Sequence, residues 1–166
     1  MKIAISNSSP LIILSTINSL NLIFNLFDEV YITPAVYEEV VIQGIAEHYH
    51  DAHLIASEIK NKKIIIKNPE IGEHNIDFSN IHPGESESIL LALSLQGSNI
   101  ILLDDEEARL YARNLGLRVK GTLGILIENY KKSFINSRAA VNILNKINQL
   151  LYLSADLYSR VLSEIT

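Results

Sequence analysis

The residues best suited to chemistry form an acidic run, DDEE at 104–107, which directly follows the apolar segment 101–103. An apolar strand that ends in four acids concentrates negative charge at one end of a sheet, and open α/β sheets bind their ligands at the carboxyl ends of strands. Clustered oxygen ligands suit a hard divalent cation such as Mg²⁺ or Mn²⁺. The run also has an ordinary explanation, because acids stabilise the positive end of a helix dipole and Asp104 can cap a helix over 106–114. On this segment alone, both interpretations stay open.

Three further polar side chains stand at predicted helix starts or along buried helix sides. Asn7 lies between the predicted first strand and the helix that follows it. Glu85 extends the apolar stripe of Ile89 and Ala92 on its predicted helix. Glu39 shares a helix side with apolar neighbours three residues away. The ordinary alternatives are a turn residue for Asn7, a favourable place in a helix dipole for Glu85, and solvent for Glu39. A carboxylate that extends an apolar stripe needs a partner, however, because an unpaired buried charge is expensive.

Other catalytic templates are absent from the sequence. The chain has no cysteine, which excludes disulfides, zinc thiolate sites and cysteine nucleophiles. It has no glycine-rich dinucleotide or phosphate-loop motif and no Gly-x-Ser-x-Gly elbow. The five histidines, at 48, 50, 53, 74 and 82, form no His-Glu-x-x-His pattern. We expect them to lie in solvated or weakly helical segments.

The bulk composition predicts one soluble, cytoplasmic domain over residues 1–166. The chain is 48% hydrophobic, which is enough for one substantial core. Segment 3–27 carries no charge, but serines and asparagines interrupt it, so no run reaches the roughly 18 apolar residues that a membrane span needs. A net charge of -5 disfavours binding of nucleic acid by bulk electrostatics, although it does not exclude a nuclease whose own acids dominate the count.

Short apolar runs alternate with helical patterns along the first three quarters of the chain. This alternation predicts a mostly parallel sheet covered by helices on both faces. The predicted strands are 3–5, 30–32, 64–67, 99–103 and 117–120. The predicted helices are 10–16, 19–27, 34–42, 84–96 and 106–114, and from about residue 124 the chain is helical over 125–130, 137–150 and 154–165.

Turn residues support these boundaries. Ser9 and Thr33 each place a capping hydroxyl before a proline, and proline suits the first turn of a helix. The pair Gly97-Ser98 and Gly116 stand just past helices, where C-terminal caps belong. Segment 68–82 has no clear periodicity, and we expect it to form a long surface loop.

The order of these parts resembles a known family, the PIN-like fold. The motifs that carry the resemblance are NSSPLI at 7–12, Pro34 with VYEEV at 36–40, PGESE at 83–87 and LDD at 103–105. The chain is most similar to the prokaryotic branch described as predicted nucleic-acid-binding proteins containing a PIN domain, whose own signature resembles 116–117 and GTLG at 121–124. The resemblance covers almost the whole chain. It implies a three-layer α/β/α fold with a mostly parallel central sheet of about five strands.

The resemblance also implies an activity and the residues that carry it. PIN domains are typically ribonucleases that depend on Mg²⁺ or Mn²⁺, many of them toxins of toxin–antitoxin pairs, with acids gathered at one end of the sheet. Carried over by motif, the metal ligands are Asn7, Glu39, Glu85, Asp104 and Asp105, of which Glu39, Glu85 and Asp105 are the catalytic residues. Asp104 is the alternative to Asp105 at the fourth acidic position, and Glu87 is the alternative to Glu85 at the third.

Substrate contacts are expected from Ser8, Arg109 and Arg113. The two arginines lie four residues apart on the predicted helix after the acidic run, and Lys120 is a further candidate. The ordinary alternative for the arginines is a solvated helix face paired with the acids of that helix.

We therefore expect a metal-dependent endoribonuclease of PIN type that acts on single-stranded RNA, with the toxin of a toxin–antitoxin pair as its biological role. The implied partners are an antitoxin protein and a second copy in a homodimer. Asn7 departs from the family pattern, which has aspartate there. An amide oxygen can bind Mg²⁺ but brings no charge, so the alternative is a catalytically weak or inactive PIN-like module that binds RNA or a protein partner.

Overall fold

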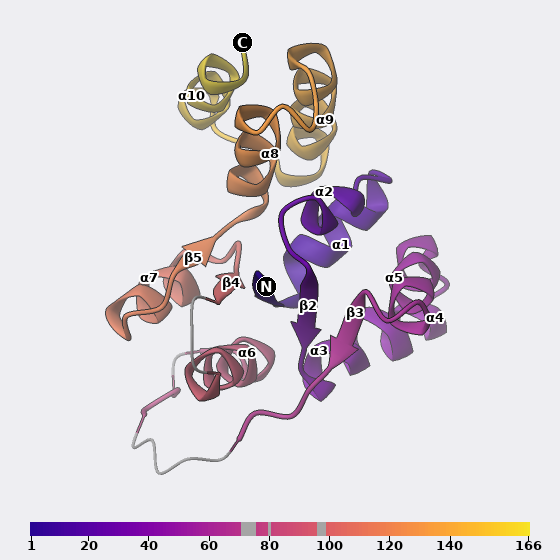
Figure 1. Ribbon diagram of the computed structural model, residues 1–166, viewed down its shortest axis with the longest axis vertical. Coiled ribbons are helices and arrows are strands. Elements are labelled where there is room, and N and C mark those ends of the chain that lie inside the picture. Colours follow the sequence, from indigo (N-terminus) through magenta and orange to yellow (C-terminus); the bar gives the residue numbers. More distant parts are fainter. Residues whose placement is uncertain (71–75, 80, 96–98) are drawn as a thin grey trace.

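The computed structural model describes residues 1–70, 76–79, 81–95 and 99–166. Its centre is a parallel sheet of five strands in the order β3-β2-β1-β4-β5 (Figure 1). The strands are β1 (Ile3–Ser6), β2 (Glu29–Ile32), β3 (Ile64–Ile66), β4 (Ile100–Leu102) and β5 (Val119–Lys120). The strands β1 to β4 are apolar over most of their length, as expected of parallel strands that are covered on both faces. The α/β class with a parallel central sheet is thus confirmed.

Helices connect the strands and continue beyond the sheet. They are α1 (Ser8–Thr16), α2 (Asn21–Phe24), α3 (Pro34–Tyr37), the π-helix η1 (Glu38–Gln43), α4 (Gly44–Ala46), α5 (His50–Lys60), α6 (Pro83–Ser94), α7 (Glu106–Asn114), α8 (Thr122–Lys131), α9 (Ser137–Leu151) and α10 (Ala155–Ile165). The last three lie together at one end of the molecule in Figure 1, away from α6 and α7. No helix within the described ranges is long and apolar enough to cross a membrane.

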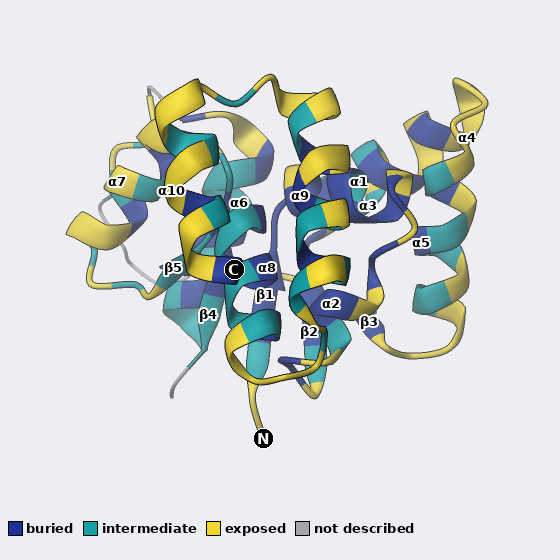
Figure 2. Cartoon of the chain, turned by 90° about the horizontal axis from the view of Figure 1, so that it is seen from above, coloured by how far each residue is buried: buried dark blue, intermediate teal, exposed yellow. Residues whose placement is uncertain are grey.

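The sheet separates two apolar cores. Ala4, Val30 and Leu102 face one core, which also contains buried residues of α1, α8, α9 and α10. Ile5 and Ile101 face the other core, which is closed by α6 and α7. Side chains alternate between the faces because successive residues of a strand point in opposite directions. Figure 2 shows the same layering, with buried residues on the strands and on the inner sides of the helices.

Three local predictions need correction. Asn7, and not Ser9, is the N-cap of α1. The predicted helix over 34–42 is a longer helical run whose middle part is the π-helix η1. The segment around His53 is not weakly helical, because α5 is a regular helix whose Ala52 and Ile55 are buried against the core.

Other turn predictions have mixed outcomes. Thr33 caps α3 as expected, since its hydroxyl accepts a hydrogen bond from the Val36 amide at 3.4 Å. Gly116 follows α7 in a left-handed conformation, with φ of 82°, which a glycine adopts without strain. Gly97 and Ser98, together with part of the predicted loop over 68–82, lie outside the described residues.

Candidate functional site

Two neighbouring strands bring distant segments of the sequence together at one edge of the sheet. β1 pairs with β4 in register, so that Ser6 lies opposite Leu102. The Asn7 amide then donates to the Leu102 carbonyl at 3.1 Å, which extends this pairing by one residue. Strand order reverses between β1 and β4, and ligands of open α/β sheets bind in the crevice at such a switch point. The residues that follow β1 and β4 therefore line the favoured position for a site.

Asn7 and Glu39 face the same small space above Gly84. A Cβ placed on Gly84, in the first turn of α6, would lie 3.8 Å from Asn7 Oδ1 and 3.8 Å from Glu39 Oε2. Ser8 Oγ donates to Glu39 Oε2 at 2.5 Å, which fixes the orientation of that carboxylate. Asn7 is only 8% exposed, and its side chain makes no capping hydrogen bond to α1. The Asn7 amide oxygen therefore lies at this space and does not cap α1.

The π-helix decides which of two adjacent glutamates enters the site. In η1, Glu39 is partly buried and Glu38 is exposed. A π-helix holds an extra residue per turn and is often found at functional sites. Behind it, Gly44 lies so close to α5 that a Cβ there would come within 2.7 Å of Ala52 Cβ. This close approach presses the segment that carries Glu39 against the rest of the fold.

Glu85 and Asp105 lie beside this space and interact through their charges. The pKa of the Glu85 carboxyl lies above its usual range, first because the side chain is partly buried, and then because Asp105 and Glu39 place negative charge nearby. Asp105 is the N-cap of α7, and its Oδ1 accepts a hydrogen bond from the Ala108 amide at 2.8 Å. One oxygen of Asp105 is thus committed to α7, while the carboxylate charge still acts on Glu85.

Asp104 performs a different task. Its Oδ1 accepts from the Thr122 amide at 2.7 Å and its Oδ2 accepts from Thr122 Oγ1 at 2.6 Å. Burial raises the pKa of the Asp104 carboxyl, whereas the Thr122 hydrogen bonds and the Arg109 charge act in the opposite direction. Both oxygens are therefore engaged at the start of α8. Asp104 joins the end of β4 to the C-terminal helices.

A family model described as a PIN domain matches residues 3–166. The chain belongs to the PIN-domain family. The match spans every motif on which the resemblance rested, and it agrees with the parallel sheet and its helical cover. No curated protein matches the chain.

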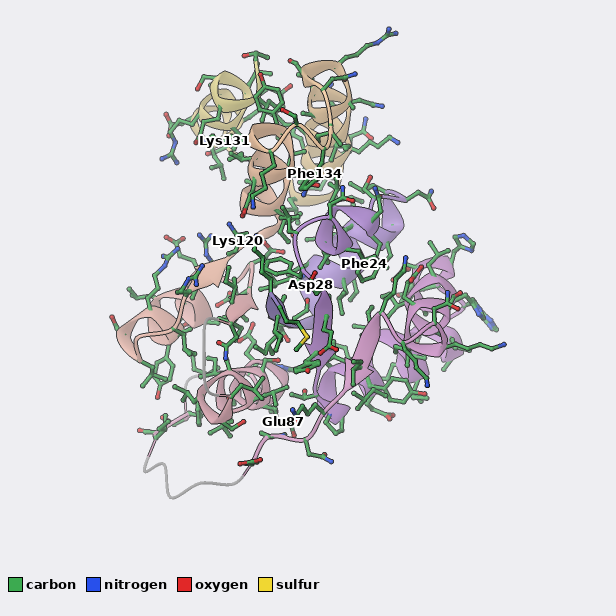
Figure 3. The ribbon with its side chains drawn as sticks, viewed as in Figure 1. Phe24, Asp28, Glu87, Lys120, Lys131 and Phe134 are labelled. Carbon is green, nitrogen blue, oxygen red and sulfur yellow. The ribbon has the colours of Figure 1, made fainter. Side chains whose placement is uncertain are left out.

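The structure gives the two members of each acidic pair different partners. Glu85 lies near enough to Asp105 and Glu39 for their charges to raise its pKa, whereas Glu87 Oε2 accepts from the Ala35 amide at 3.3 Å and so binds the start of α3. Figure 3 shows Glu87 on α6 beside α3. Likewise, Asp105 remains beside the space above Gly84 while Asp104 is held by the C-terminal helices.

The candidate substrate residues of the PIN domain are spread over a wider area. Ser8 is buried and donates to Glu39, so its hydroxyl positions a carboxylate. Arg109 is directed toward Asp104 and Gly121, and its buried Nε has no hydrogen-bond partner among the described residues. Arg113 is exposed on α7. Lys120, labelled in Figure 3, forms an ion pair with Glu128 at 2.5 Å.

The acids of this PIN domain surround a space without forming a closed cage. Among the described residues, no three Asp, Glu or His side chains lie close enough to hold a metal ion by themselves. The donor atoms nevertheless fit a hard cation, since the Asn7 amide oxygen and one Glu39 carboxylate oxygen lie around an opening that a single Cβ on Gly84 would fill. Gly84 and His82, which caps α6, were not predicted as part of this site. In the sequence, Gly84 belongs to the PGESE motif at 83–87, and His82 directly precedes that motif.

Proposed function

We propose that this PIN domain is a metal-dependent endoribonuclease that cleaves single-stranded RNA with Mg²⁺ or Mn²⁺. The observation that carries the proposal is the convergence of Asn7 Oδ1 and Glu39 Oε2 on the space above Gly84, at the switch point of the sheet. Glu85 and Asp105 stand beside that space with coupled charges. Cleavage of a phosphodiester without a metal gives no reason to gather negative charge in the site, because the RNA that must bind there is a polyanion. A divalent cation does give a reason, since it binds carboxylates and offsets the charge of the phosphate.

In this proposal, the ion is held by Asn7, Glu39, Glu85 and Asp105. When bound, such an ion lowers the pKa of a water molecule and neutralises charge that grows on the phosphate. Ser8 keeps the Glu39 carboxylate oriented through its hydrogen bond. In the metal-free protein, partial burial and the negative charges of Asp105 and Glu39 raise the pKa of the Glu85 carboxyl, and a bound cation would relieve this repulsion. Asp104 keeps β4 and α8 together and does not act on the substrate.

A cleavage assay tests the proposal directly. Purified protein with MnCl₂ or MgCl₂ should cut a fluorescent single-stranded RNA, and excess EDTA should abolish the reaction. Glu39→Gln should lower the rate by about a hundredfold or more, a typical loss when one group that stabilises the transition state is removed. Glu38→Gln is the matched control, because this neighbouring glutamate is exposed. Cleavage that survives EDTA, or that is equal in both variants, would overturn the proposal.

A second candidate function is a catalytically weak PIN module that binds RNA or a protein partner. The neutral Asn7 at a position where the family has aspartate favours it. Asn7→Asp distinguishes the two functions, because it adds a charge beside the ion without changing side-chain size. If the site is catalytic, the variant should bind Mn²⁺ more tightly in calorimetry and cleave RNA faster. If Asn7 is only structural, like charges should lower the stability of the metal-free protein without a gain in Mn²⁺ affinity.

The biological setting that we propose is a toxin–antitoxin pair, with this chain as the toxin and as a homodimer. The proposal rests on the family alone. Co-expression with the protein encoded by the adjacent reading frame should relieve any growth arrest that the chain causes. Growth arrest that the neighbour leaves unchanged would contradict the pairing, and light scattering of the purified chain would report the dimer.

A further inference from the structure

We propose that His82 supplies a nitrogen ligand to the cation of the proposed site and thereby shifts its preference from Mg²⁺ to Mn²⁺. This inference rests on the proposed function, since it concerns the same ion. It adds a residue of a different ligand type to the four side chains with oxygen donors described above.

The geometry places His82 at the same opening as the oxygen donors. A Cβ on Gly84 would lie 3.7 Å from His82 Nδ1, compared with 3.8 Å from Asn7 Oδ1 and from Glu39 Oε2. Three donor atoms from three separate segments of the chain thus surround one point. That point is open because residue 84 has no side chain.

The Asn7 side chain is a second, independent indication of a ligand. It is more than nine-tenths buried, and among the described residues no hydrogen bond of its side chain is found. The described atoms that are fully buried without a partner belong to Glu58 and Arg109, so the Asn7 amide is accessible from the opening, where a ligand can reach it. Its Oδ1 is directed to the opening above Gly84, where a bound cation would satisfy it.

His82 can release its nitrogen at little cost. Nδ1 accepts a hydrogen bond from the Gly84 amide, but the donor–acceptor distance is 3.4 Å, which lies beyond the usual range for such bonds. The residue is exposed, so its ring can turn toward the ion without repacking the core. As the N-cap of α6, its backbone stays fixed by the helix while the ring moves.

A nitrogen ligand has a consequence for the choice of metal. Mg²⁺ prefers oxygen ligands and retains its water shell, whereas imidazole binds first-row transition metals well. Asn7 contributes no charge, so the site lacks one of the carboxylates that would favour Mg²⁺ electrostatically. An imidazole beside Asn7 replaces part of the lost binding energy, and it does so more for Mn²⁺ than for Mg²⁺.

Pulsed electron paramagnetic resonance of the protein with one equivalent of MnCl₂ tests this assignment. We expect a ¹⁴N modulation from a coordinated imidazole in the wild-type protein and in His53→Asn, whose histidine is exposed on α5. His82→Asn should lose the modulation. Asparagine is itself a good N-cap, so this variant should keep α6 intact. By calorimetry, its Mn²⁺ affinity should fall by about tenfold or more, as for loss of a supporting group at a metal site, while its Mg²⁺ affinity changes much less.

The outcomes separate this inference from the proposed function. If Mn²⁺ binds and RNA is cleaved but no ¹⁴N modulation is seen, His82 is not a ligand and the ribonuclease proposal stands. If the modulation persists in His82→Asn, another nitrogen binds the ion and the assignment is wrong. If neither Mn²⁺ nor Mg²⁺ binds the wild-type protein, the metal site itself is refuted, and both proposals fall.

Discussion

Gly84→Ala should separate the stability of the fold from the binding of the cation. The new Cβ would lie 3.7 to 3.8 Å from its nearest neighbours, which is ordinary van der Waals contact. No steric penalty is therefore expected. Replacing a glycine where alanine can take the same backbone conformation stabilises a protein by about 0.4–1 kcal/mol, chiefly because the unfolded chain loses freedom.

The same methyl group should block the ion. Mg²⁺ and its ligand oxygens are about 2.1 Å apart, and a Cβ only 3.8 Å from both Asn7 Oδ1 and Glu39 Oε2 occupies the side of these oxygens on which the ion would bind. We predict that the free energy of unfolding of Gly84→Ala rises by the amount given above, so that the variant unfolds at a higher urea concentration. We also predict that it binds Mn²⁺ at least about tenfold more weakly, which corresponds to about 1.4 kcal/mol. Denaturation followed by circular dichroism and calorimetric titration with MnCl₂ measure the two effects.

A control and a refuting result complete this test. Gly124→Ala makes the same change in the first turn of α8, where the nearest atom is the flexible Lys120 Cγ at 3.0 Å. It should leave Mn²⁺ affinity unchanged. If Gly84→Ala is as stable as predicted but binds Mn²⁺ like the wild type, the ion does not occupy the space above Gly84, and the reasoning on the site is wrong.

Three further substitutions follow from the contacts. Asp105→Asn should change the free energy of unfolding by less than about 0.5 kcal/mol, because asparagine also caps helices well, yet lower RNA cleavage by about a hundredfold or more; equal activity would remove Asp105 from the site. Glu85→Gln should stabilise the metal-free protein by about 0.5 kcal/mol, a small gain because the side chain is only partly buried. Because the pKa of the Glu85 carboxyl is raised in the folded protein, the stability that its proton contributes is fully present below the ordinary pKa of about 4.5 and is lost as pH rises through the raised value. The urea midpoints of wild type and Glu85→Gln should therefore diverge as pH rises from about 4.5 through the raised pKa, and they should stay apart at higher pH. Gly121→Ala should cost about 1–3 kcal/mol by overpacking, since its Cβ would lie 2.9 Å from Asp104 Oδ1; unchanged thermal unfolding would argue against Asp104 as a structural link.

The sequence predicts the sheet and the broad position of the site because these depend on local patterns. Apolar runs such as 30–32 and 101–103 are too short for typical helices, and their alternation with helical patterns favours buried strands. Asn7 and the acids at 104–105 directly follow such strands, and the carboxyl ends of parallel strands lie on the same side of a sheet. Which strands are neighbours cannot be derived from periodicity, and the structure pairs β1 with β4.

The different partners of neighbouring acids could not be predicted, because they depend on tertiary contacts. Asp104 and Asp105 are identical in type and adjacent in sequence, and only the position of Thr122, 18 residues after Asp104, commits the first to the fold. Glu85 and Glu87 are separated in the same way, by the start of α3.

The π-helix is a further feature that no local pattern reveals. The segment EEVVIQ at 38–43 has the composition of an ordinary helix. Its wider turn depends on packing around Gly44, which lies against Ala52 of α5. The role that we propose for His82 likewise depends on a contact across the site and not on a spacing with other histidines.

The most direct test of the central claim is the position of Mn²⁺ in a crystal of the protein. Crystals soaked in MnCl₂ should show an anomalous difference peak at the carboxyl ends of β1 and β4, within bonding distance of Asn7 Oδ1 and Glu39 Oε2 and beside Glu85 and Asp105. A peak only at the exposed acids of α7, or no peak at all after soaking, would contradict a divalent-cation site at this edge of the sheet.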